Sequence, residues 1–160
     1  MNLELQAGAV MNEFDEAPQA AKRLLVLDDD LSIRRTSAEV LERAGFFVDC
    51  GEDGEEGWAA LTATHYDLVI TDQQMPRLCG FDLLCRMRAA GMNCPVVLVT
   101  GSHHLDARIS DVFDAVLHKP FFLYELVVTV QRVLVHCSPL HRPKSFPPDH
   151  ADRAKTLHSV

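Results

Sequence analysis

Three carboxylates, a hydroxyl and a lysine stand at the ends of four short apolar runs in this chain. Asp28 and Asp29 follow the first run, Asp72 the second, Thr100 the third and Lys119 the fourth. In an open parallel sheet, ligands bind at the carboxyl ends of the strands. If the four runs are strands of one such sheet, the five side chains meet in a single crevice. Oxygen ligands, a hydroxyl and an ammonium together suit a divalent metal ion and a phosphoryl group.

The acidic residues predict a bound cation. Three carboxylates in one crevice repel one another, so the site should take up at least one proton or cation. Mg²⁺ fits because it prefers oxygen ligands, keeps several waters and needs only one or two carboxylates beside phosphate oxygens. The backbone carbonyl of Gln74, in the loop after Asp72, is placed to add a ligand. The neighbouring acid, Asp30, is interpreted as a helix cap instead.

Three of these side chains fit phosphoryl transfer, although each also has a plainer interpretation. Asp72 can act as a nucleophile and form an aspartyl phosphate, which hydrolyses and therefore serves as a reversible mark. The Thr100 hydroxyl can donate to a phosphoryl oxygen, and Lys119 can pair with carboxylates first and with the phosphoryl group later. Taken singly, Asp72 can be a turn aspartate, Thr100 a β-branched strand residue and Lys119 part of an ordinary Lys-Pro pair. The Lys119–Pro120 peptide bond is a candidate for the cis form.

Length, charge and cysteine content limit the class of protein. The chain has 160 residues, which indicates one domain, and its 48% hydrophobic content is ordinary for a globular protein. The formal net charge of −8 argues against nucleic acid as a partner, because phosphate backbones attract basic surfaces. The five cysteines include no C-x-x-C pair, which indicates reduced thiols and a cytoplasmic location. No membrane insertion is expected, because polar and charged residues interrupt the longest apolar stretch, Phe121 to Val135.

Apolar runs and amphipathic segments alternate through the middle of the chain, so five β–α units are predicted. The strands are expected at residues 23–28, 46–50, 67–71, 95–99 and 114–118. The helices are expected at residues 30–44, after Gly54, and at residues 80–90, 104–112 and 121–136. Five such units in sequence imply an α/β fold, with a doubly wound parallel sheet, helices on both faces and right-handed crossovers.

Apolar periodicity predicts which side of each helix faces the core. In the second helix, the residues expected to point inward are Trp58, Ala59 and Leu61. In the last helix, the expected inward stripe consists of Leu123, Leu126, Val127, Val130 and Leu134.

The two ends of the chain lack such periodicity. Residues 1–20 are predicted to form a flexible N-terminal arm, and residues 137–160, which include four prolines, a flexible C-terminal tail. The folded domain is therefore expected over residues 21–136.

Four segments of the chain, taken in order, resemble the receiver domain of two-component response regulators, the CheY-like family. The matching segments are LLVLDDDLSIRR, DLVITDQQMPRLCG, VVLVTG and LHKPF. The resemblance covers about residues 22–136, and the D-x-x-M-P-x-x-x-G segment is already specific by itself. It implies a flavodoxin-like sheet with the strand order 2-1-3-4-5.

The resemblance also implies a role for each residue of the crevice. Asp72 would accept a phosphoryl group from the phosphohistidine of a histidine kinase or a histidine phosphotransfer protein. Thr100 and Lys119 would bind the phosphoryl oxygens, while Gln74 and Ser102 occupy positions that tune the lifetime of the phosphoryl group. The residues implied to hold Mg²⁺ are Asp28, Asp29, Asp72 and, through its backbone carbonyl, Gln74.

Among the features that depart from the pattern of the family, two concern the switch region. Val116 stands three positions before the lysine, where the family usually has an aromatic residue that rotates with the switch threonine. The interval from Thr100 to Lys119 is 19 positions, somewhat short for the family. The fourth helix or its flanking loops are therefore expected to be reduced.

Three functions from different classes follow. The first is a stand-alone receiver that signals through contacts with an unknown downstream protein, or relays the phosphoryl group onward. Such a receiver is no enzyme beyond self-phosphorylation from phosphodonors and autodephosphorylation. The second is a pseudo-receiver, a scaffold that binds partners without phosphorylation, mildly favoured by Val116 and the short interval. The third is an aspartate-nucleophile phosphatase of the haloacid-dehalogenase type. Such enzymes have an Asp-x-Asp motif, and Asp28 and Asp30 match its spacing. That enzyme would leave Asp72 unexplained and would require acids after a late strand, where residues 100–104 contain none.

Overall fold

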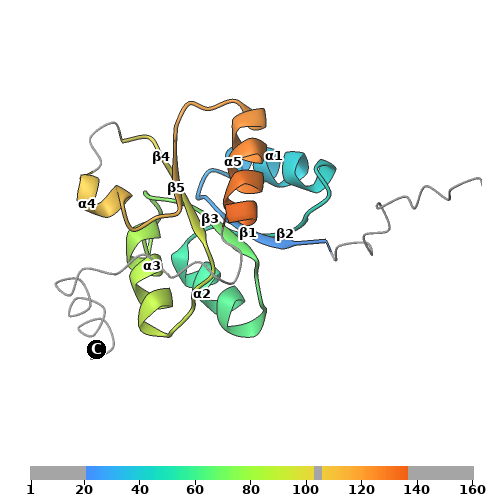
Figure 1. Ribbon diagram of the computed structural model, residues 1–160. Coiled ribbons are helices and arrows are strands. Elements are labelled where there is room, and N and C mark those ends of the chain that lie inside the picture. Colours follow the sequence, from blue (N-terminus) through green and yellow to red (C-terminus); the bar gives the residue numbers. More distant parts are fainter. Residues whose placement is uncertain (1–20, 103–105, 137–160) are drawn as a thin grey trace, which may run out of the picture.

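Strands and helices alternate along the chain in the computed structural model, which describes residues 21–102 and 106–136 (Figure 1). The strands are β1 (Arg23–Leu27), β2 (Phe47–Gly51), β3 (Leu68–Asp72), β4 (Val96–Thr100) and β5 (Ala115–His118). The helices are α1 (Leu31–Arg43), α2 (Gly54–Ala63), α3 (Gly80–Ala89), α4 (Ala107–Ser110) and α5 (Leu123–His136). The predicted arm and tail, residues 1–20 and 137–160, lie outside the described residues.

The five strands form one parallel sheet in the order β2-β1-β3-β4-β5, which confirms the predicted fold class. The register pairs Leu27 with Thr71, Asp72 with Val99 and Thr100 with His118. Because all strands are parallel, their carboxyl ends lie along one edge. Asp28, Asp72, Thr100 and Lys119 therefore stand at that edge, where the sequence places them.

Different helices cover the two faces of the sheet. α1 and α5 lie on one face, and α2 and α3 lie on the other (Figure 1). Successive residues of a strand point to opposite faces. Thus Leu25 and Leu27 join the core beneath α2 and α3, while Leu24 and Val26 join the core beneath α1 and α5. Burial on both sides explains why the central strands are continuous apolar runs.

Polar residues set the starts of the first two helices. The Asp30 carboxylate accepts hydrogen bonds from the backbone N–H groups of Ser32 and Ile33, so its predicted capping role is confirmed. Asp53 caps α2 in the same way. After α1, Gly45 has φ of +93°, a left-handed conformation that glycine adopts without a side-chain clash.

Two predicted helix faces need correction. Ala59 is exposed, whereas Ala60 packs against the core with Trp58 and Leu61. Position 60 lies three residues after the buried Gly57, so it falls on the same side of the helix.

In α5, Leu123 is exposed, and Val133 is buried instead. The helix begins at Leu123 rather than at residue 121, so its first residue lies at the rim of the sheet. The fourth helix is reduced as expected, since α4 has only 4 residues. Residues 103–105, which include part of its predicted range, lie outside the described residues.

Candidate functional site

Three carboxylates converge at the carboxyl edge of the sheet. Asp28 follows β1 and is 4% exposed, Asp72 ends β3 and is 5% exposed, and Asp29 is exposed. One carboxylate oxygen from each of the three lies within 4.8 Å of the others. The structure thus brings together the three acids that the sequence predicted to share a crevice.

Lys119 supplies the positive charge of this cluster. Its Nζ lies 2.8 Å from Oδ2 of Asp28 and 3.5 Å from Oδ2 of Asp72. Its backbone N–H donates to the carbonyl of Thr100 over 2.8 Å, which fixes the end of β5 against the end of β4. The Lys119–Pro120 peptide bond, a candidate for the cis form from the sequence, is cis. The lysine is therefore held by its backbone and by two carboxylates.

The cluster shifts the protonation equilibria of its members. Burial raises the pKa of Asp72 above the usual value of an aspartate, and the charge of Asp28 raises it further, while Lys119 partly opposes both effects. Burial lowers the pKa of Lys119, but its hydrogen bond to Asp28 and the charge of Asp72 outweigh this and raise the pKa overall. The negatively charged form of Asp72 is therefore disfavoured in the absence of a cation, mainly because the residue is buried.

Backbone groups hold the two buried carboxylates in place. Asp28 Oδ1 accepts from the N–H of Asp30 over 2.9 Å, and Asp72 Oδ1 accepts from the N–H of Gln73 over 2.8 Å. Nη1 of Arg34 donates to the carbonyl of Asp28 over 2.6 Å, which links the start of α1 to the site. The carboxylates are thus oriented before any ligand arrives.

The remaining predicted residues occupy the same edge in different environments. The Thr100 side chain is fully buried, and its Oγ1 accepts from the N–H of Ser102 over 3.1 Å. Because the oxygen is the acceptor in that bond, the hydroxyl hydrogen can still be donated. Gln74 is exposed in the loop after β3. Val116 is half-buried and packs against the core on the α2–α3 side of the sheet.

The donor set fits Mg²⁺. All side-chain ligands are carboxylate oxygens, two of the three acids are buried, and a single lysine neutralises only part of their charge. Mg²⁺ takes oxygen ligands and is commonly bound through one or two carboxylates. The cluster therefore has the chemistry of a magnesium site.

Sequence reasoning missed a second set of charges beside the crevice. Arg77, in the loop after Asp72, has φ of +63° and extends to the start of α2, where its guanidinium binds Asp53. Asp53 is fully buried. An Asp-Gly pair before a helix signals a cap, but no local pattern pairs that cap with an arginine 24 residues later.

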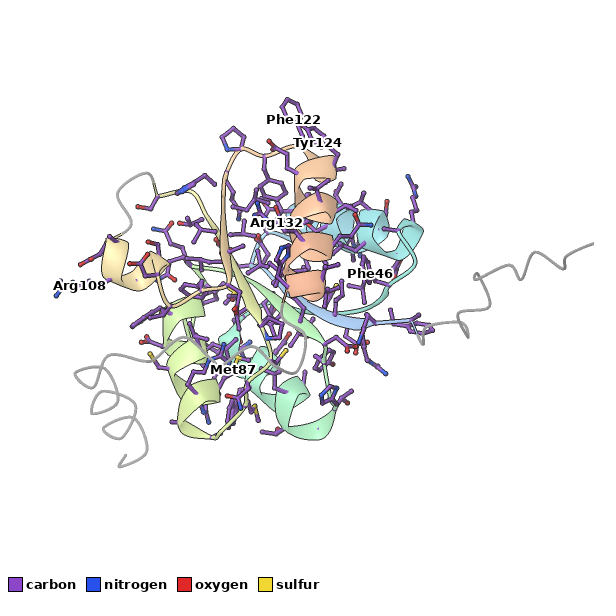
Figure 2. All side chains as sticks on the ribbon, in the orientation of Figure 1. Phe46, Met87, Arg108, Phe122, Tyr124 and Arg132 are labelled. Carbon is purple, nitrogen blue, oxygen red and sulfur yellow. The ribbon has the colours of Figure 1, made fainter. Side chains whose placement is uncertain are left out.

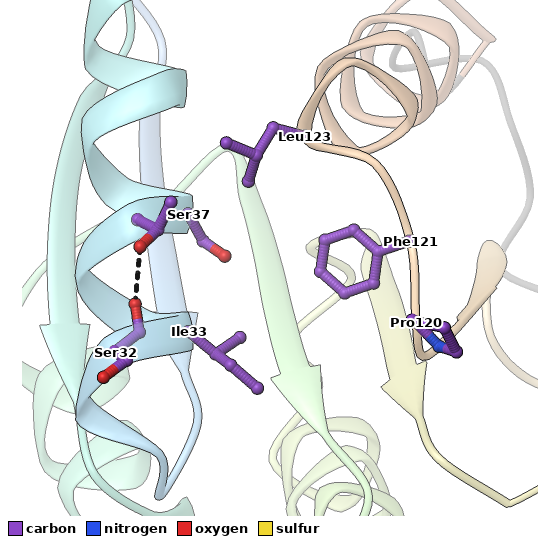
Figure 3. A pocket seen from close by; sticks show the side chains of 7 residues that line it. Ser32, Ile33, Ser37, Pro120, Phe121 and Leu123 are labelled. Atoms are coloured by element: carbon purple, nitrogen blue, oxygen red, sulfur yellow. Dashed lines mark hydrogen bonds between the residues drawn. The ribbon is translucent and has the colours of Figure 1, made fainter.

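The surface beside the site is apolar and partly hollow. A pocket of about 330 Å³ lies between α1 and the segment after β5, lined by Ile33, Pro120 and Phe121 among others (Figure 3). At the start of α5, the rings of Phe122 and Tyr124 stack on each other and are 69% and 65% exposed (Figure 2). Since Pro120 directly follows Lys119, this apolar surface adjoins the charged crevice.

Comparison with known proteins identifies the family. The sequence model of the response regulator receiver domain family matches residues 24–131 of this chain. The response regulator MprA of Mycobacterium sp. (strain KMS) is 31% identical over 126 residues, which are 77% of this chain and 55% of that protein. The chain thus spans about half the length of the curated relatives it matches.

Solved structures agree with this match. Chemotaxis response regulator CheY4 of Vibrio cholerae is 28% identical, with a TM-score of 0.67 over 71% of this chain and 98% of that one. Response regulator TrrA of Thermotoga maritima, solved in complex with Mg(2+)-BeF, is 32% identical, with a TM-score of 0.65 over 70% of this chain and 98% of that one.

The chain belongs to the response regulator receiver domain family of two-component systems. Receiver domains are signalling domains rather than enzymes, and the family binds Mg²⁺ in an acidic pocket such as the aspartate cluster. Response regulators interact with histidine kinases and with downstream targets. Among the described residues, no helix is long and apolar enough to cross a membrane.

Proposed function

We propose that this chain is a phosphorylation switch whose phosphoacceptor is Asp72. One observation carries the proposal: a buried carboxylate with a raised pKa lies beside two further acids and 3.5 Å from a lysine ammonium. A nucleophilic carboxylate needs charge compensation to meet a phosphoryl group, which is itself anionic. The Mg(2+)-BeF complex of the TrrA relative supports the same interpretation.

The proposed reaction is transfer of a phosphoryl group from the phosphohistidine of a histidine kinase or a histidine phosphotransfer protein. A carboxylate oxygen of Asp72 forms the new P–O bond while the P–N bond breaks, and the imidazole nitrogen leaves with the bonding electrons. Lys119 then pairs with a phosphoryl oxygen in place of the Asp72 carboxylate, and the Thr100 hydroxyl donates to another. Catalysis in such transfers is mainly positioning and charge stabilisation.

The residues that would hold Mg²⁺ are Asp28, Asp29, Asp72 and the carbonyl of Gln74. When bound, the ion would neutralise charge on the acids and on the phosphoryl group. Gln74 and Ser102 are proposed to tune how long the phosphoryl group persists. Small phosphodonors are expected to phosphorylate Asp72 without a kinase, and the acyl phosphate is expected to hydrolyse spontaneously.

Signal output is proposed to use altered protein contacts or onward relay of the phosphoryl group. Phosphorylation changes the local charge and shifts the population between two conformations, which differ in affinity for a partner. The proposed contact surface comprises α4, β5 and α5, where the exposed Tyr124 and Val128 lie. A location in the cytoplasm completes this proposal.

A phosphorylation-independent scaffold is the second candidate, because Val116 occupies the position of the switch aromatic. The phosphatase alternative loses its main support. The second acid of its motif, Asp30, accepts hydrogen bonds from two helix N–H groups and acts as a cap. Turnover of small phosphate esters, compared between Asp28→Asn and Asp72→Asn, would reveal any such enzyme.

Intact-protein mass spectrometry after incubation with acetyl phosphate tests the proposal. The wild type should gain one phosphoryl group in the presence of Mg²⁺, and neither the magnesium-free protein nor Asp72→Asn should gain it. An adduct that persists in Asp72→Asn would refute the assignment of Asp72. Absence of any adduct, also with a phosphorylated histidine phosphotransfer protein as donor, would favour the scaffold.

A further inference from the structure

The loop between β3 and α3, residues 73–79, is fixed at both ends. At its start, the N–H of Gln73 donates to the carbonyl of Val99 over 3.0 Å. At its end, the carbonyl of Leu78 accepts from the N–H of Gly54, the first residue of α2, over 3.1 Å. A Cβ on Gly54 would lie 2.4 Å from that carbonyl, so the loop contacts α2 backbone to backbone. Gln74, the proposed carbonyl ligand, lies between these two attachments.

Arg77 makes the second attachment of the loop to α2. Its guanidinium binds the Asp53 carboxylate, lies 3.1 Å from Oε1 of Glu52 and lies 3.8 Å from Oε1 of Glu56. Its backbone adopts φ of +63°. For a residue with a Cβ, such a left-handed conformation is strained. A strained conformation persists only when surrounding interactions impose it, and the three acids supply those interactions.

Asp53 makes this attachment stronger than an ordinary surface ion pair. The Asp53 side chain is 0% exposed, and it already accepts from the N–H groups of Glu55 and Glu56. A buried carboxylate that loses its cation is strongly destabilised. Arg77 and Asp53 are therefore held together by the burial of one partner, although the other is half-exposed.

We infer that Arg77 is a positioning residue for the metal site: by binding Asp53, it fixes the loop that presents the Gln74 carbonyl. This inference depends on the proposed function, because it takes that carbonyl as a ligand. Arg77 would touch neither Mg²⁺ nor the phosphoryl group and would act only through the loop. Groups that hydrogen-bond directly to metal ligands typically change metal affinity by about 10–100-fold when they are removed; Arg77 acts one step further out, so we expect an effect at the lower end of that range.

The chain offers a matched control in Arg86. This arginine also connects α3 to α2, because Nη1 lies 3.1 Å from the Glu55 carboxylate and the guanidinium lies 4.4 Å from the centre of the Trp58 ring. It belongs to the last turn of α3, outside the loop that carries Gln74. Loss of Arg86 should weaken the contact between α2 and α3 without moving a metal ligand.

The test is calorimetric titration of the full chain with MgCl₂, well below its unfolding temperature. Arg77→Gly is the decisive variant, because glycine accepts the loop's φ without strain but lacks the guanidinium. We expect it to bind Mg²⁺ about tenfold more weakly than the wild type, while Arg86→Gln binds as tightly as the wild type. Arg77→Lys should fall between them, since lysine keeps the charge but not the planar fork of donors.

Asp53→Asn gives an independent route to the same result, because asparagine still caps a helix but lacks the charge. The double variant with Arg77→Gly should bind Mg²⁺ no more weakly than Arg77→Gly alone. Wild-type affinity in Arg77→Gly would overturn the inference and leave the proposed function standing. No Mg²⁺ binding by the wild type would overturn the inference together with the metal site. Mg²⁺ binding without phosphorylation of Asp72 would count against the proposed function alone.

Discussion

Replacing Asp72 with asparagine should raise the free energy of unfolding of the magnesium-free protein, although the residue lies at the proposed phosphorylation site. Asparagine has nearly the same shape and keeps an oxygen that can accept the hydrogen bond from Gln73. The substitution therefore removes one negative charge and replaces Oδ2, which lies 3.5 Å from Nζ of Lys119, with an amide NH₂ group. Its effect on stability measures how strongly the empty cluster disfavours that charge.

The magnitude follows from the distances in the cluster. The three carboxylate oxygens lie within 4.8 Å of one another; with this upper limit as the separation and an effective dielectric constant of about 20, a unit charge repels Asp72 by about 3.5 kcal/mol. Asp28 and Asp29 thus contribute about 7 kcal/mol of repulsion together, against about 5 kcal/mol of attraction from Lys119 at 3.5 Å. Water screens the exposed Asp29, while burial of Asp72 adds a penalty for its charge. We therefore expect a net stabilisation of about 1–2 kcal/mol.

Urea unfolding in a buffer that contains a chelator measures this difference. Addition of Mg²⁺ at ten times its dissociation constant should stabilise the wild type by about 1.4 kcal/mol and stabilise Asp72→Asn less, so the gap between the two proteins closes. Asp67→Asn is the control, because Asp67 accepts from Nζ of Lys22 and from the N–H of Arg23 at the opposite edge of the sheet. That variant should lose stability. A magnesium-free Asp72→Asn less stable than the wild type would refute the argument from crowded charge.

Three further predictions concern titrating groups. Lys119→Met removes the cation of the cluster and should lower the free energy of unfolding by about 3 kcal/mol without Mg²⁺. Urea titration should show a larger stabilisation by Mg²⁺ than in the wild type, and equal stabilisation would contradict this prediction. Because the pKa of Asp72 is raised in the folded state, the magnesium-free wild type should lose stability relative to Asp72→Asn as pH rises above about 3.9, the usual aspartate value. Thermal melts across that range should show the stability curves of the two proteins diverging, and parallel curves would count against the pKa shift. Burial and the 2.7 Å hydrogen bond to Asp49 raise the pKa of Tyr66 to about 12. When the ultraviolet absorbance is titrated with pH, the wild type minus Tyr66→Phe difference should therefore show a phenol that ionises near that value. The stability that its proton provides should be lost as pH rises from about 10 towards 12.

The residues that end the strands were predictable because their placement depends only on the parallel arrangement of the sheet. Once the apolar runs are strands of one sheet, Asp28, Asp72, Thr100 and Lys119 must lie at the same edge. The cap at Asp30 was predictable for a similar reason, since it depends on neighbours two and three residues away.

Features that depend on where a helix begins, or on distant partners, were not predictable. The choice between Ala59 and Ala60 changes with a rotation of α2 by one residue, which the apolar pattern of that short helix does not determine. The contact between Arg77 and Asp53 requires a left-handed backbone and a partner on another element. Neither requirement can be recognised from the local sequence.

The position of Trp58 beneath Arg86 gives the molecule a built-in optical probe. It is the single tryptophan of the chain, and it lies on α2, which the loop after Asp72 contacts directly. A change in its emission when Mg²⁺ binds would report a change in the surroundings of the ring, which include the guanidinium of Arg86 on α3. The fluorescence of the unlabelled protein can therefore show whether binding at the site alters the face of the sheet opposite to α5.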